Sequence, residues 1–394
     1  MKKRLVILTP KLNGGGAERI MSYLSNFAPS NYEVVIVLFK KKISYNIKSR
    51  IYVLKNNYYG GVLDRIKSII EVCRILLRER AGAVLGCKKD GRNLALLQMV
   101  SKPFIRIETH PQSPPIFGLR GKLPYFLKTR ILYRRARKVI VISAAIKQFF
   151  MEKYGFPSNK IIVIHNPCDV KSIRVRAGET FEVWEKKIFE TDNVLINVGR
   201  LSKEKGQQYL IRIFRHVNQE IPNSRLILVG DGPLRPHLEK LISDLCLEGK
   251  ALILGWRTNP FKYMARSKLF CLSSTREGFP NVVVESLACG LPVMAADCLS
   301  GPREILAPGT QYKVGRLREP EYGEYGILMP VMDGKLYTAS DPLTWQEEVW
   351  AEEIVKLLRD PRPLKVYREK ALKRALDFDA EKQVKTYFEV IFNE

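Results

Sequence analysis

Short apolar runs of strand length alternate with segments of helix length along the whole chain, and this alternation limits the fold more than any other feature. The runs are continuously apolar, which is typical of strands that are buried on both faces. Strands of this kind, joined by helices, form parallel sheets. The sequence therefore predicts an α/β fold with two doubly wound parallel sheets. The expected strands are 5–8, 34–39, 83–85, 105–108, 139–142 and 161–164 in the first half, and 194–198, 226–229, 252–254, 269–272 and 293–296 in the second.

The length of 394 residues favours two domains, because single hydrophobic cores rarely grow that large. Hydrophobic periodicity lapses between Asp169 and Asp192, so we place the domain boundary there. The predicted domains are 1–180 and 181–375, followed by a helical segment over 376–394. Residues 310–345 are rich in Gly, Tyr and Pro and are expected to be irregular.

Positive charge is concentrated in the first half of the chain. Of the total net charge of +26, residues 1–180 hold 35 basic and 10 acidic residues, a net +25, whereas residues 181–394 are close to neutral. Such asymmetry predicts an acidic partner for the first half, either an anionic membrane surface or nucleic acid. Segment 62–80 has an apolar face bordered by Arg and Lys, and segment 117–138 mixes apolar and aromatic side chains with Arg and Lys, as interfacial helices do. In the alternative interpretation, their apolar stripes face the core.

Features of membrane-spanning and secreted proteins are weak in this sequence. No run approaches the eighteen or so apolar residues of a transmembrane helix. The first apolar run, 5–8, is shorter than the core of a signal peptide. Seven cysteines without a Cys-x-x-Cys pair argue against a disulfide framework. We therefore expect a cytoplasmic protein.

Two glutamates, Glu277 and Glu285, flank the predicted start of a helix. Pro280 is tolerated in the first turn of a helix but not in its interior, so the helix begins near Pro280 or the next residue. Glu277 then lies on the preceding loop and Glu285 about one turn inside the helix. Carboxylates beside the positive end of a helix suit a ligand that offers hydroxyls and phosphates together, such as a nucleotide-sugar.

A basic loop follows the strand that ends near Gly199. Arg200 and Lys205 lie just beyond this strand, at the carboxyl edge of the sheet, where doubly wound folds bind ligands. Positive side chains at this edge predict a binding site for the diphosphate of a donor.

Glycine-rich turns follow two other predicted strands. Gly14, Gly15 and Gly16 come after the first strand, where a turn without side chains lets backbone amides approach a phosphate or a sugar. Asp231, in the turn 230–232, is expected to border a nucleobase. Trp256 follows another strand and either stacks on a base or packs in the core.

These motifs, in this order along nearly the whole chain, resemble those of the retaining glycosyltransferases of family 4. The resemblance implies the GT-B fold, in which two Rossmann-like domains face across a cleft and the final helix packs on the first domain. It also implies that Glu285 binds the ribose hydroxyls, while Glu277 and the backbone of Gly278 and Phe279 hold the sugar. His110, directly after a predicted strand, is then expected beside the transferred sugar.

One departure from the family is Pro280, which replaces a glycine of many relatives and removes a backbone donor. The stretch 297–306 resembles bacterial members that transfer galactose-type or N-acetylhexosamine residues, and this favours a UDP-linked donor. We therefore expect a hexose or N-acetylhexosamine to be transferred to a lipid-linked or saccharide acceptor in cell-surface glycan synthesis, by a protein peripheral to the inner membrane face.

Alternatives within and outside this class remain open at this point. A mannosyl- or glucosyltransferase with a GDP- or UDP-linked donor fits the same motifs. A nucleic-acid-binding protein would use the basic first half. The near-neutral second half with its motif set argues against it, so no nucleic-acid partner is expected.

No metal ion or other cofactor is expected. Arg200, Lys205 and the end of a helix already supply positive charge for the diphosphate, and the expected catalytic residues are these two with Glu277 and His110. Asp377 and Asp379 match an Asp-x-Asp pattern of metal-dependent glycosyltransferases of another fold. Their position between helical segments near the C-terminus indicates coincidence.

Overall fold

The computed structural model describes residues 2–13, 16–56, 60–87, 103–108, 133–310 and 317–393. The chain folds into two compact units, Met1–Pro167 with Asp379–Glu394, and Cys168–Phe378. Predicted and observed boundaries differ: the units divide after residues 167 and 378, not after 180 and 375.

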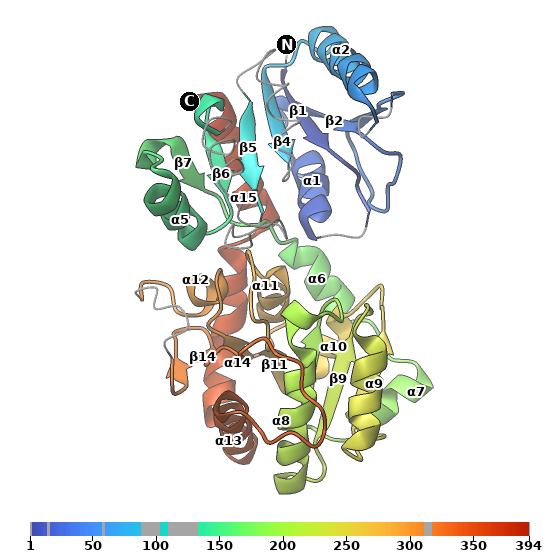
Figure 1. Ribbon diagram of the computed structural model, residues 1–394, viewed down its shortest axis with the longest axis vertical. Coiled ribbons are helices and arrows are strands. Elements are labelled where there is room, and N and C mark those ends of the chain that lie inside the picture. The colour runs from blue at the N-terminus through green and yellow to red at the C-terminus, as the bar shows by residue number, and fades with distance from the viewer. Residues whose placement is uncertain are drawn as a thin grey trace. The chain divides into compact units, whose positions relative to one another are not determined.

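The first unit contains a parallel sheet with the strand order β3-β2-β1-β4-β5-β6-β7 (Figure 1). Its strands are β1 (Lys3–Thr9), β2 (Tyr32–Leu38), β3 (Arg50–Val53), β4 (Ala83–Cys87), β5 (Phe104–Ile107), β6 (Val139–Val141) and β7 (Ile161–Val163). Its helices, within the described ranges, are α1 (Gly16–Asn26), α2 (Val62–Arg78), α5 (Ala144–Tyr154), the short η1 (Ser158–Lys160) and α15 (Ala380–Asn393). The order reverses between β1 and β4, so the prediction of a doubly wound parallel sheet is confirmed for this unit.

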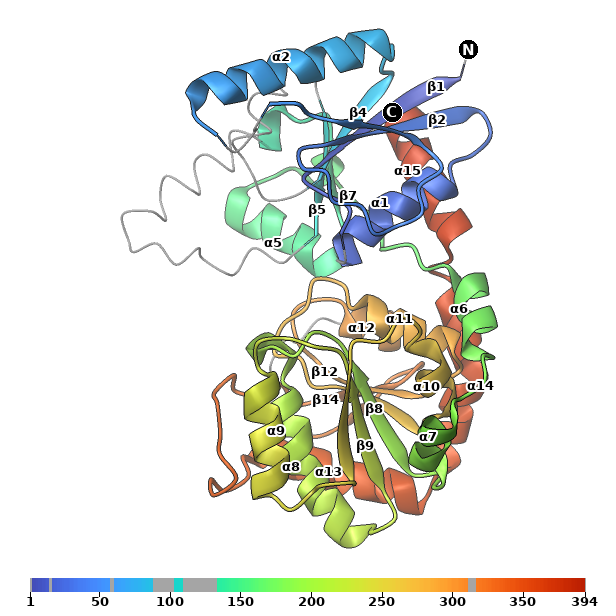
Figure 2. The ribbon, with the colours of Figure 1, turned by 90° about the vertical axis from the view of Figure 1, so that its right-hand side faces the viewer.

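Helices cover both faces of the first sheet (Figure 2). Successive side chains of a strand point to opposite faces. Val6 and Leu8 therefore pack in the cluster that includes the buried side of α2, whereas Leu5 and Ile7 pack in the cluster of α1 and α15. The final helix of the chain is thus part of the core of the first unit.

A buried arginine also joins α15 to the first sheet. Arg106 on β5 is 1% exposed, and its Nε donates a hydrogen bond of 2.8 Å to the hydroxyl of Tyr387 on α15. The same guanidinium donates to the side chains of Glu108 and Asn166. Because a buried charge is costly unless it is paired, this cluster specifies where α15 packs.

The second unit contains a sheet with the order β10-β9-β8-β11-β12-β14-β13. Its strands are β8 (Val194–Val198), β9 (Arg225–Val229), β10 (Ala251–Gly255), β11 (Leu269–Leu272), β12 (Val293–Ala296), β13 (Glu321–Tyr322) and β14 (Ile327–Met329). Its helices are α6 (Val170–Ala177), α7 (Val183–Lys186), η2 (Lys187–Phe189), η3 (Lys203–Lys205), α8 (Gln207–Glu220), α9 (Arg235–Asp244), α10 (Phe261–Arg266), α11 (Asn281–Ala288), α12 (Pro302–Leu306), α13 (Trp345–Arg359) and α14 (Arg362–Leu376). Apart from the antiparallel edge strand β13, the described strands pair in parallel, as predicted.

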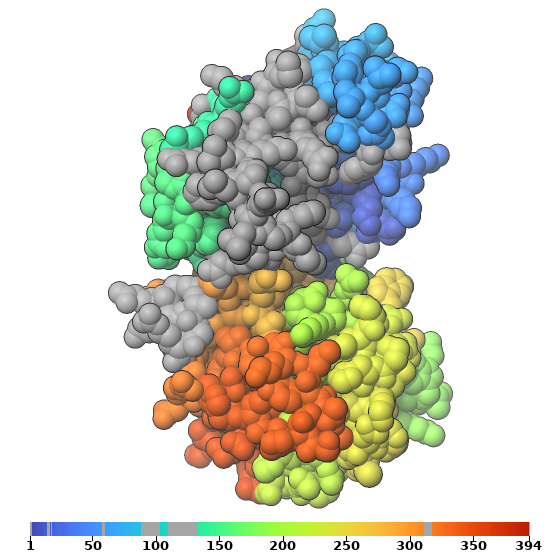
Figure 3. All heavy atoms as spheres, viewed as in Figure 1, coloured from blue at the N-terminus to red at the C-terminus, as the bar shows by residue number. Residues whose placement is uncertain are grey.

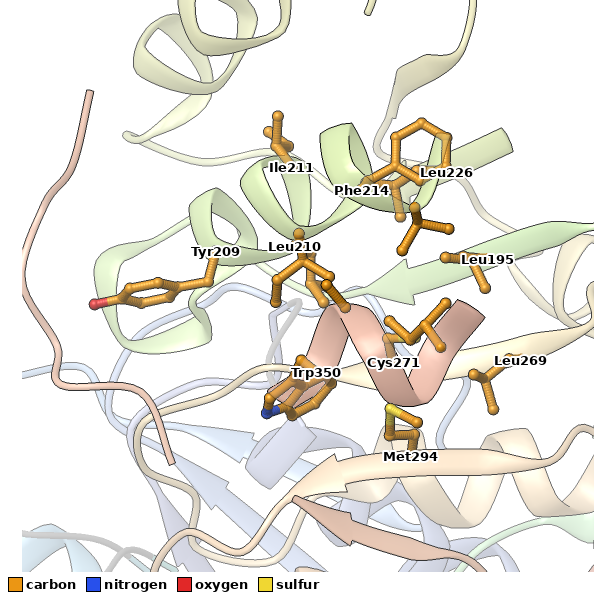
Figure 4. Packing of buried hydrophobic residues seen from close by; sticks show 14 of the residues in the cluster. Leu195, Tyr209, Leu210, Ile211, Phe214, Leu226, Leu269, Cys271, Met294 and Trp350 are labelled. Carbon is orange, nitrogen blue, oxygen red and sulfur yellow. The ribbon is translucent and has the colours of Figure 1, made fainter. Parts of the chain in front are cut away.

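The main core of this unit lies between the sheet and helices α8, α9 and α13. Figure 4 shows Trp350 of α13 and Phe214 of α8 packed with strand residues such as Met294. The indole nitrogen of Trp350 donates to the carbonyl of Pro330 at 2.9 Å, so the largest buried side chain is also satisfied.

Residues 169–192 belong to the second unit, although the sequence suggested a connection there. They form the short helices α6 and α7, and α6 packs on α10. Glu185 of α7 is buried and accepts hydrogen bonds from Lys262 and Tyr263 of α10. Helices of this length, held partly by polar contacts, leave little hydrophobic periodicity in the sequence.

The stretch 310–345 is not irregular throughout, which corrects the expectation from its composition. Its run Ile327–Met329 is the fully buried strand β14, paired with β12. Further on, Arg212 of α8 donates to Glu347 at 2.7 Å and to the carbonyls of Thr338, Asp341 and Pro342. The segment between β14 and α13 therefore holds α8 in place.

No helix within the described ranges has both the length and the apolar character needed to cross a membrane.

Candidate active site

The predicted basic residues and Glu277 meet where the order of the second sheet reverses. The order changes direction between β8 and β11, and doubly wound sheets bind ligands in the crevice at such a point of their carboxyl edge. Arg200 and Lys205 lie on the loop after β8, and Glu277 lies on the loop after β11.

Lys205 and Glu277 form an ion pair across this crevice. Lys205 Nζ donates to Glu277 Oε1 at 2.7 Å, and Ser274 Oγ donates to the same oxygen at 2.7 Å. Burial tends to lower the pKa of Lys205, but the charge and hydrogen bond of Glu277 outweigh it, so the pKa lies above its usual value. Lys205 therefore stays protonated, and Glu277 is held in one orientation before any ligand binds.

Arg200, on the same loop, is left exposed. Within the described residues its guanidinium makes no hydrogen bond or ion pair, whereas its carbonyl accepts a 3.0 Å bond from Gln207 Nε2. Gln207 Nε2 also lies 3.3 Å from Asn197 Oδ1, which ties the loop to β8. The backbone around Arg200 is braced while its charge faces solvent.

Two glycines allow the loops at this edge to pass close to one another. Gly206 has a positive φ of 67°, and a Cβ there would lie 2.2 Å from the carbonyl oxygen of Ser273. A Cβ on Gly232 would lie 2.3 Å from the carbonyl oxygen of Leu201. Both contacts are with backbone, so a larger residue would displace the loop that carries Arg200.

Asp231 lies on the neighbouring loop, after β9. Its side chain is exposed and accepts a 2.8 Å bond from the amide of Gly232, and its carbonyl accepts 3.0 Å from the amide of Leu201. Trp256, after β10, is 71% exposed, which excludes the core-packing interpretation of this residue.

Helix α11 starts at Asn281, directly after Pro280, so the predicted helix start is confirmed. Glu285 lies inside this helix and is 7% exposed. The ring of Phe279 is buried and packs on Phe378 with centroids 5.4 Å apart. The side chain of Phe279 is therefore occupied by packing within the second unit.

The stretch 297–306 packs against the glutamate loop. Glu277 exchanges backbone hydrogen bonds with it, donating to the carbonyl of Leu299 at 2.7 Å and accepting from the amide of Ser300 at 2.7 Å. The hydroxyl of Ser300 also donates to the carbonyl of Gly278. The Glu277 loop and the stretch 297–306, which the resemblance named separately, are thus held together by hydrogen bonds.

Arg303, in the same stretch, has a structural role. It is buried, and its Nη2 lies 2.8 Å from Asp297 Oδ2 while its Nη1 lies 2.6 Å from Glu321 Oε1. Burial raises the pKa of Asp297 even though Arg303 acts in the opposite direction. This guanidinium crosslinks the stretch to β13 and is occupied by protein carboxylates.

Sequence reasoning missed three polar side chains of the site. Ser274 supports Glu277, as described above. Ser202 Oγ, on the loop of Arg200, and Gln207 Oε1, at the start of α8, are buried and have no hydrogen-bond partner in the described part of the chain. The sequence could have indicated these residues by their positions shortly after the predicted strands β8 and β11, because segments that follow such strands lie at the ligand-binding edge of the sheet.

Some predicted site residues of the first unit lie outside the described residues, namely His110, Gly14 and Gly15. Gly16 is described and is the first residue of α1, where it is exposed.

The Asp-x-Asp pair has structural partners. Asp377 pairs with Arg374 at 2.8 Å, and Asp379 Oδ1 accepts from the amide of Glu381 at 3.0 Å, at the start of α15. Within the described ranges, no group of three or more His, Cys, Asp or Glu side chains is arranged to hold a metal ion.

Two family models match the chain. The model of glycosyl transferases group 1 matches residues 179–321, which include the Lys205 and Glu277 loops, and that of glycosyltransferase family 4 matches residues 107–172. The chain is a glycosyltransferase with a group 1 domain and a family 4 domain.

Relatives of this glycosyltransferase include archaeal and bacterial proteins. An uncharacterized glycosyltransferase of Methanocaldococcus jannaschii is 35% identical over 273 residues, which span 68% of this chain and 66% of that protein. The N-acetylgalactosamine-N,N'-diacetylbacillosaminyl-diphospho-undecaprenol 4-alpha-N-acetylgalactosaminyltransferase of Campylobacter jejuni is 26% identical over 96% of both chains.

Solved structures show the same fold. HepE of Anabaena, crystallised with UDP, matches over 100% of both chains with a TM-score of 0.76 and 20% identity. WaaG, a glycosyltransferase involved in lipopolysaccharide biosynthesis, matches with a TM-score of 0.69 and 15% identity, over 99% of this chain and 100% of WaaG. The predicted GT-B fold of this glycosyltransferase is confirmed.

Proposed function

We propose that this glycosyltransferase moves a hexose or N-acetylhexosamine from a UDP-linked donor to a lipid-linked or saccharide acceptor, with retention of configuration at the anomeric carbon. The observation that carries the proposal is the Lys205–Glu277 pair at the crevice between β8 and β11, with the exposed Arg200 on the same loop. Two cations there suit a diphosphate, and the fixed carboxylate suits sugar hydroxyls.

Two unsatisfied groups support a polar ligand at this loop. Ser202 Oγ and Gln207 Oε1 are buried without partners in the described part of the chain, and such groups are costly unless a ligand or water satisfies them. The names of the relatives support the donor and acceptor classes: the Campylobacter jejuni relative is by name an N-acetylgalactosaminyltransferase for a diphospho-undecaprenol-linked sugar, and HepE was crystallised with UDP.

In the reaction, the bond between the anomeric carbon and the diphosphate oxygen breaks, and a bond from that carbon to an acceptor oxygen forms on the same face. Negative charge develops on the departing UDP, where Arg200 and Lys205 stabilise it. The departing phosphate takes the proton of the acceptor hydroxyl, so no covalent nucleophile is needed. A transient glycosyl-enzyme is the alternative route to retention.

The remaining residues orient the donor. Glu285 accepts hydrogen bonds from the ribose hydroxyls, and Glu277 with the backbone of Gly278 and Phe279 holds the sugar. His110 is assigned to the transferred sugar from the resemblance alone. No metal ion takes part in the proposed reaction.

The proposed place of action is the cytoplasmic face of a membrane, with the protein bound peripherally. The first unit holds 34 basic and 12 acidic residues, a net +22, which favours contact with anionic lipid.

Binding of UDP, GDP and ADP to the wild type and to Arg200→Ala and Glu285→Ala tests the donor site by calorimetry. Lys203→Ala is the matched control, because Lys203 is an exposed lysine in the same turn as Lys205. We expect UDP to bind most tightly, both variants to bind it about tenfold or more weakly, and the control to bind it as the wild type does. Preference for GDP or ADP would exclude the UDP donor, and no binding of any of the three would overturn the proposal.

The stereochemical outcome is tested separately. The anomeric configuration of the product, determined by NMR with a UDP-sugar and a polyprenyl-diphosphate sugar in detergent, should match that of the donor. An inverted product would exclude retention while leaving the donor assignment intact.

A further inference from the structure

Helix α2 of the first unit is apolar on two different faces. One face packs on the sheet and includes the buried residues Val72, Ile75 and Leu76. The other face is open to solvent. Its apolar residues, here named the α2 stripe, are Val62, Leu63, Ile66, Ile70 and Leu77, with exposed fractions of 70%, 73%, 48%, 45% and 78%.

The α2 stripe lies on the far side of the helix from the core. At about 100° per residue, its five side chains fall within an arc of about 100°, centred roughly 150° from the centre of the buried face. From Val62 to Leu77 the stripe is about 22 Å long. In Figure 3 the atoms of α2, blue at the upper right, lie at the surface. A continuous apolar stripe on the outside of a domain is typical of an interaction site, since single exposed apolar residues are normally scattered.

Basic side chains border the stripe. Lys67, Arg74 and Arg78 are exposed and lie within about 60° of Leu63 around the helix. The next acidic residue around this side, Glu71, is occupied, because its carboxylate accepts from the backbone amide of Lys55 at 3.1 Å. The exposed side of α2 therefore combines an aliphatic surface with a positive edge.

We propose that α2 is an interfacial helix, which inserts the α2 stripe among the headgroups of an anionic bilayer while Lys67, Arg74 and Arg78 contact lipid phosphates. Basic residues beside aliphatic side chains are the pattern of helices that lie in a membrane surface. The inference rests on the proposed function only in that it places the enzyme at the membrane of a lipid-linked acceptor.

Two other occupants fit the stripe less well. Nucleic acid would meet the basic edge, but five aliphatic side chains gain little from a phosphate backbone. A second copy of this chain would bring together two units of net charge +22 each, and like charges oppose such contacts. An anionic bilayer is attracted by the charge and also removes the stripe from water.

Sedimentation with vesicles tests the proposal. The stripe variant carries Leu63→Gln, Ile66→Gln, Ile70→Gln and Leu77→Gln. The matched control carries Val175→Gln, Val183→Gln, Val366→Gln and Leu376→Gln, four apolar residues of the second unit that are exposed to similar extents. With phosphatidylglycerol-containing vesicles, we expect the partition coefficient to fall at least about tenfold in the stripe variant and to stay unchanged in the control.

A variant with reversed charges separates insertion of the apolar stripe into the bilayer from electrostatic attraction to anionic lipid. Lys67→Glu, Arg74→Glu and Arg78→Glu should abolish the preference for anionic over phosphatidylcholine vesicles and weaken the salt dependence of binding. Vesicle binding by the stripe variant equal to that of the wild type would overturn the proposal. So would preferential binding of the wild type to duplex DNA, or a dimer that the stripe variant converts to a monomer.

UDP binding, measured by calorimetry, tests the proposed function separately from the interfacial helix. It also shows whether the stripe variant is folded. The stripe variant should bind UDP as the wild type does, since none of its changes lies in the second unit. Stripe-dependent vesicle binding by a protein that binds no UDP would refute the proposed function alone. UDP binding and sugar transfer in detergent, without stripe-dependent vesicle binding, would refute the interfacial helix alone.

Discussion

Lys205 Nζ lies 2.7 Å from Glu277 Oε1, which joins two loops that are 72 residues apart in the sequence. The pair lies where the order of the second sheet reverses, between β8 and β11. The cation that we propose for the diphosphate therefore also orients the carboxylate that we propose for the sugar. Because the contact exists without ligand, little side-chain ordering remains to be done when the donor binds.

Separate substitutions of Lys205 and Glu277 should affect different steps, the first mainly donor binding and the second mainly turnover. We expect Lys205→Ala to weaken UDP binding about tenfold or more, since the proposed charge-assisted contact to phosphate is lost. Glu277→Gln should leave UDP affinity within about threefold but reduce kcat by about 10²–10³, because Glu277 is the carboxylate that we propose holds the sugar. Calorimetry and initial rates measure the two effects. Equal losses of UDP affinity in both variants would contradict these roles.

Backbone crowding at the site predicts that replacing Gly206 or Gly232 by alanine is costly, whereas replacing Gly61 is not. Gly206→Ala and Gly232→Ala place a Cβ 2.2 Å and 2.3 Å from carbonyl oxygens of the site loops, whereas a Cβ on Gly61 meets nothing within 4 Å. We expect the first two to lower the unfolding free energy by about 2 kcal/mol or more and to weaken UDP binding. Gly61→Ala should do neither. Urea unfolding and calorimetry check both quantities, and normal UDP affinity in Gly232→Ala would show that the loop adapts.

Removal of divalent metal should not affect the reaction. In the proposed mechanism, Arg200 and Lys205 supply the positive charge that a metal ion provides in other glycosyltransferases. We expect the rate of UDP-sugar consumption after treatment with EDTA to equal the untreated rate, and Asp377→Asn to have no effect on it. A rate that falls with EDTA and recovers with Mn²⁺ or Mg²⁺ would refute the metal-independent mechanism.

One buried hydroxyl adds to the apolar packing that holds α15 on the first unit. Tyr387→Phe leaves Arg106 Nε without its 2.8 Å acceptor, and we expect a loss of about 1–3 kcal/mol in unfolding free energy. Thr386→Ala, at a half-buried position of the same helix, should change it by less than about 0.5 kcal/mol. Urea unfolding compares the variants. Equal stability of Tyr387→Phe and the wild type would mean that another group satisfies the guanidinium.

Glu79, directly after α2, should make stability depend on pH. Burial alone would raise its pKa, but hydrogen bonds from Tyr52 and Arg50 outweigh burial and bring the pKa below its ordinary value of 4.5. A depressed carboxyl pKa stabilises the fold above 4.5, and this contribution is lost as the pH falls through the folded-state value. Glu79→Gln should therefore be less stable than the wild type at pH 7, with a difference that shrinks below pH 4.5. Unfolding free energies between pH 7 and 3 test this, with the exposed Glu152→Gln as control.

The parallel sheets could be predicted because their strands are continuously apolar, but three strands escaped. Edge strand β3, Arg50–Val53, is only half-buried and polar at one end, so it lacks that signature. Strand β14, Ile327–Met329, is fully buried but three residues long, and it follows a Gly- and Tyr-rich segment that hides it. Two-residue β13 exists through its pairing with β14 and has no local signal.

Within the site, local sequence rules predicted where a helix begins better than they predicted which side chains contact one another. Pro280 set the start of α11, because proline has no amide hydrogen to give to a helix interior. The bond between Lys205 and Glu277, and the occupation of Arg303 by Asp297 and Glu321, depend on distances between loops that only tertiary structure sets. The sequence also could not predict that the α2 stripe is exposed. An amphipathic pattern does not show which of two apolar helix faces packs on the sheet.

The return of the chain to the first unit after residue 378 has a consequence for biosynthesis. The ribosome makes all of Cys168–Phe378 before it makes α15, whose residues Val384, Tyr387, Phe388 and Ile391 lie in the core of the first unit. Until then, one face of the first sheet lacks part of its cover and Arg106 lacks its acceptor on α15. The unit that starts synthesis first is thus the last to complete its fold, and its nascent form is the stage most in need of protection from aggregation.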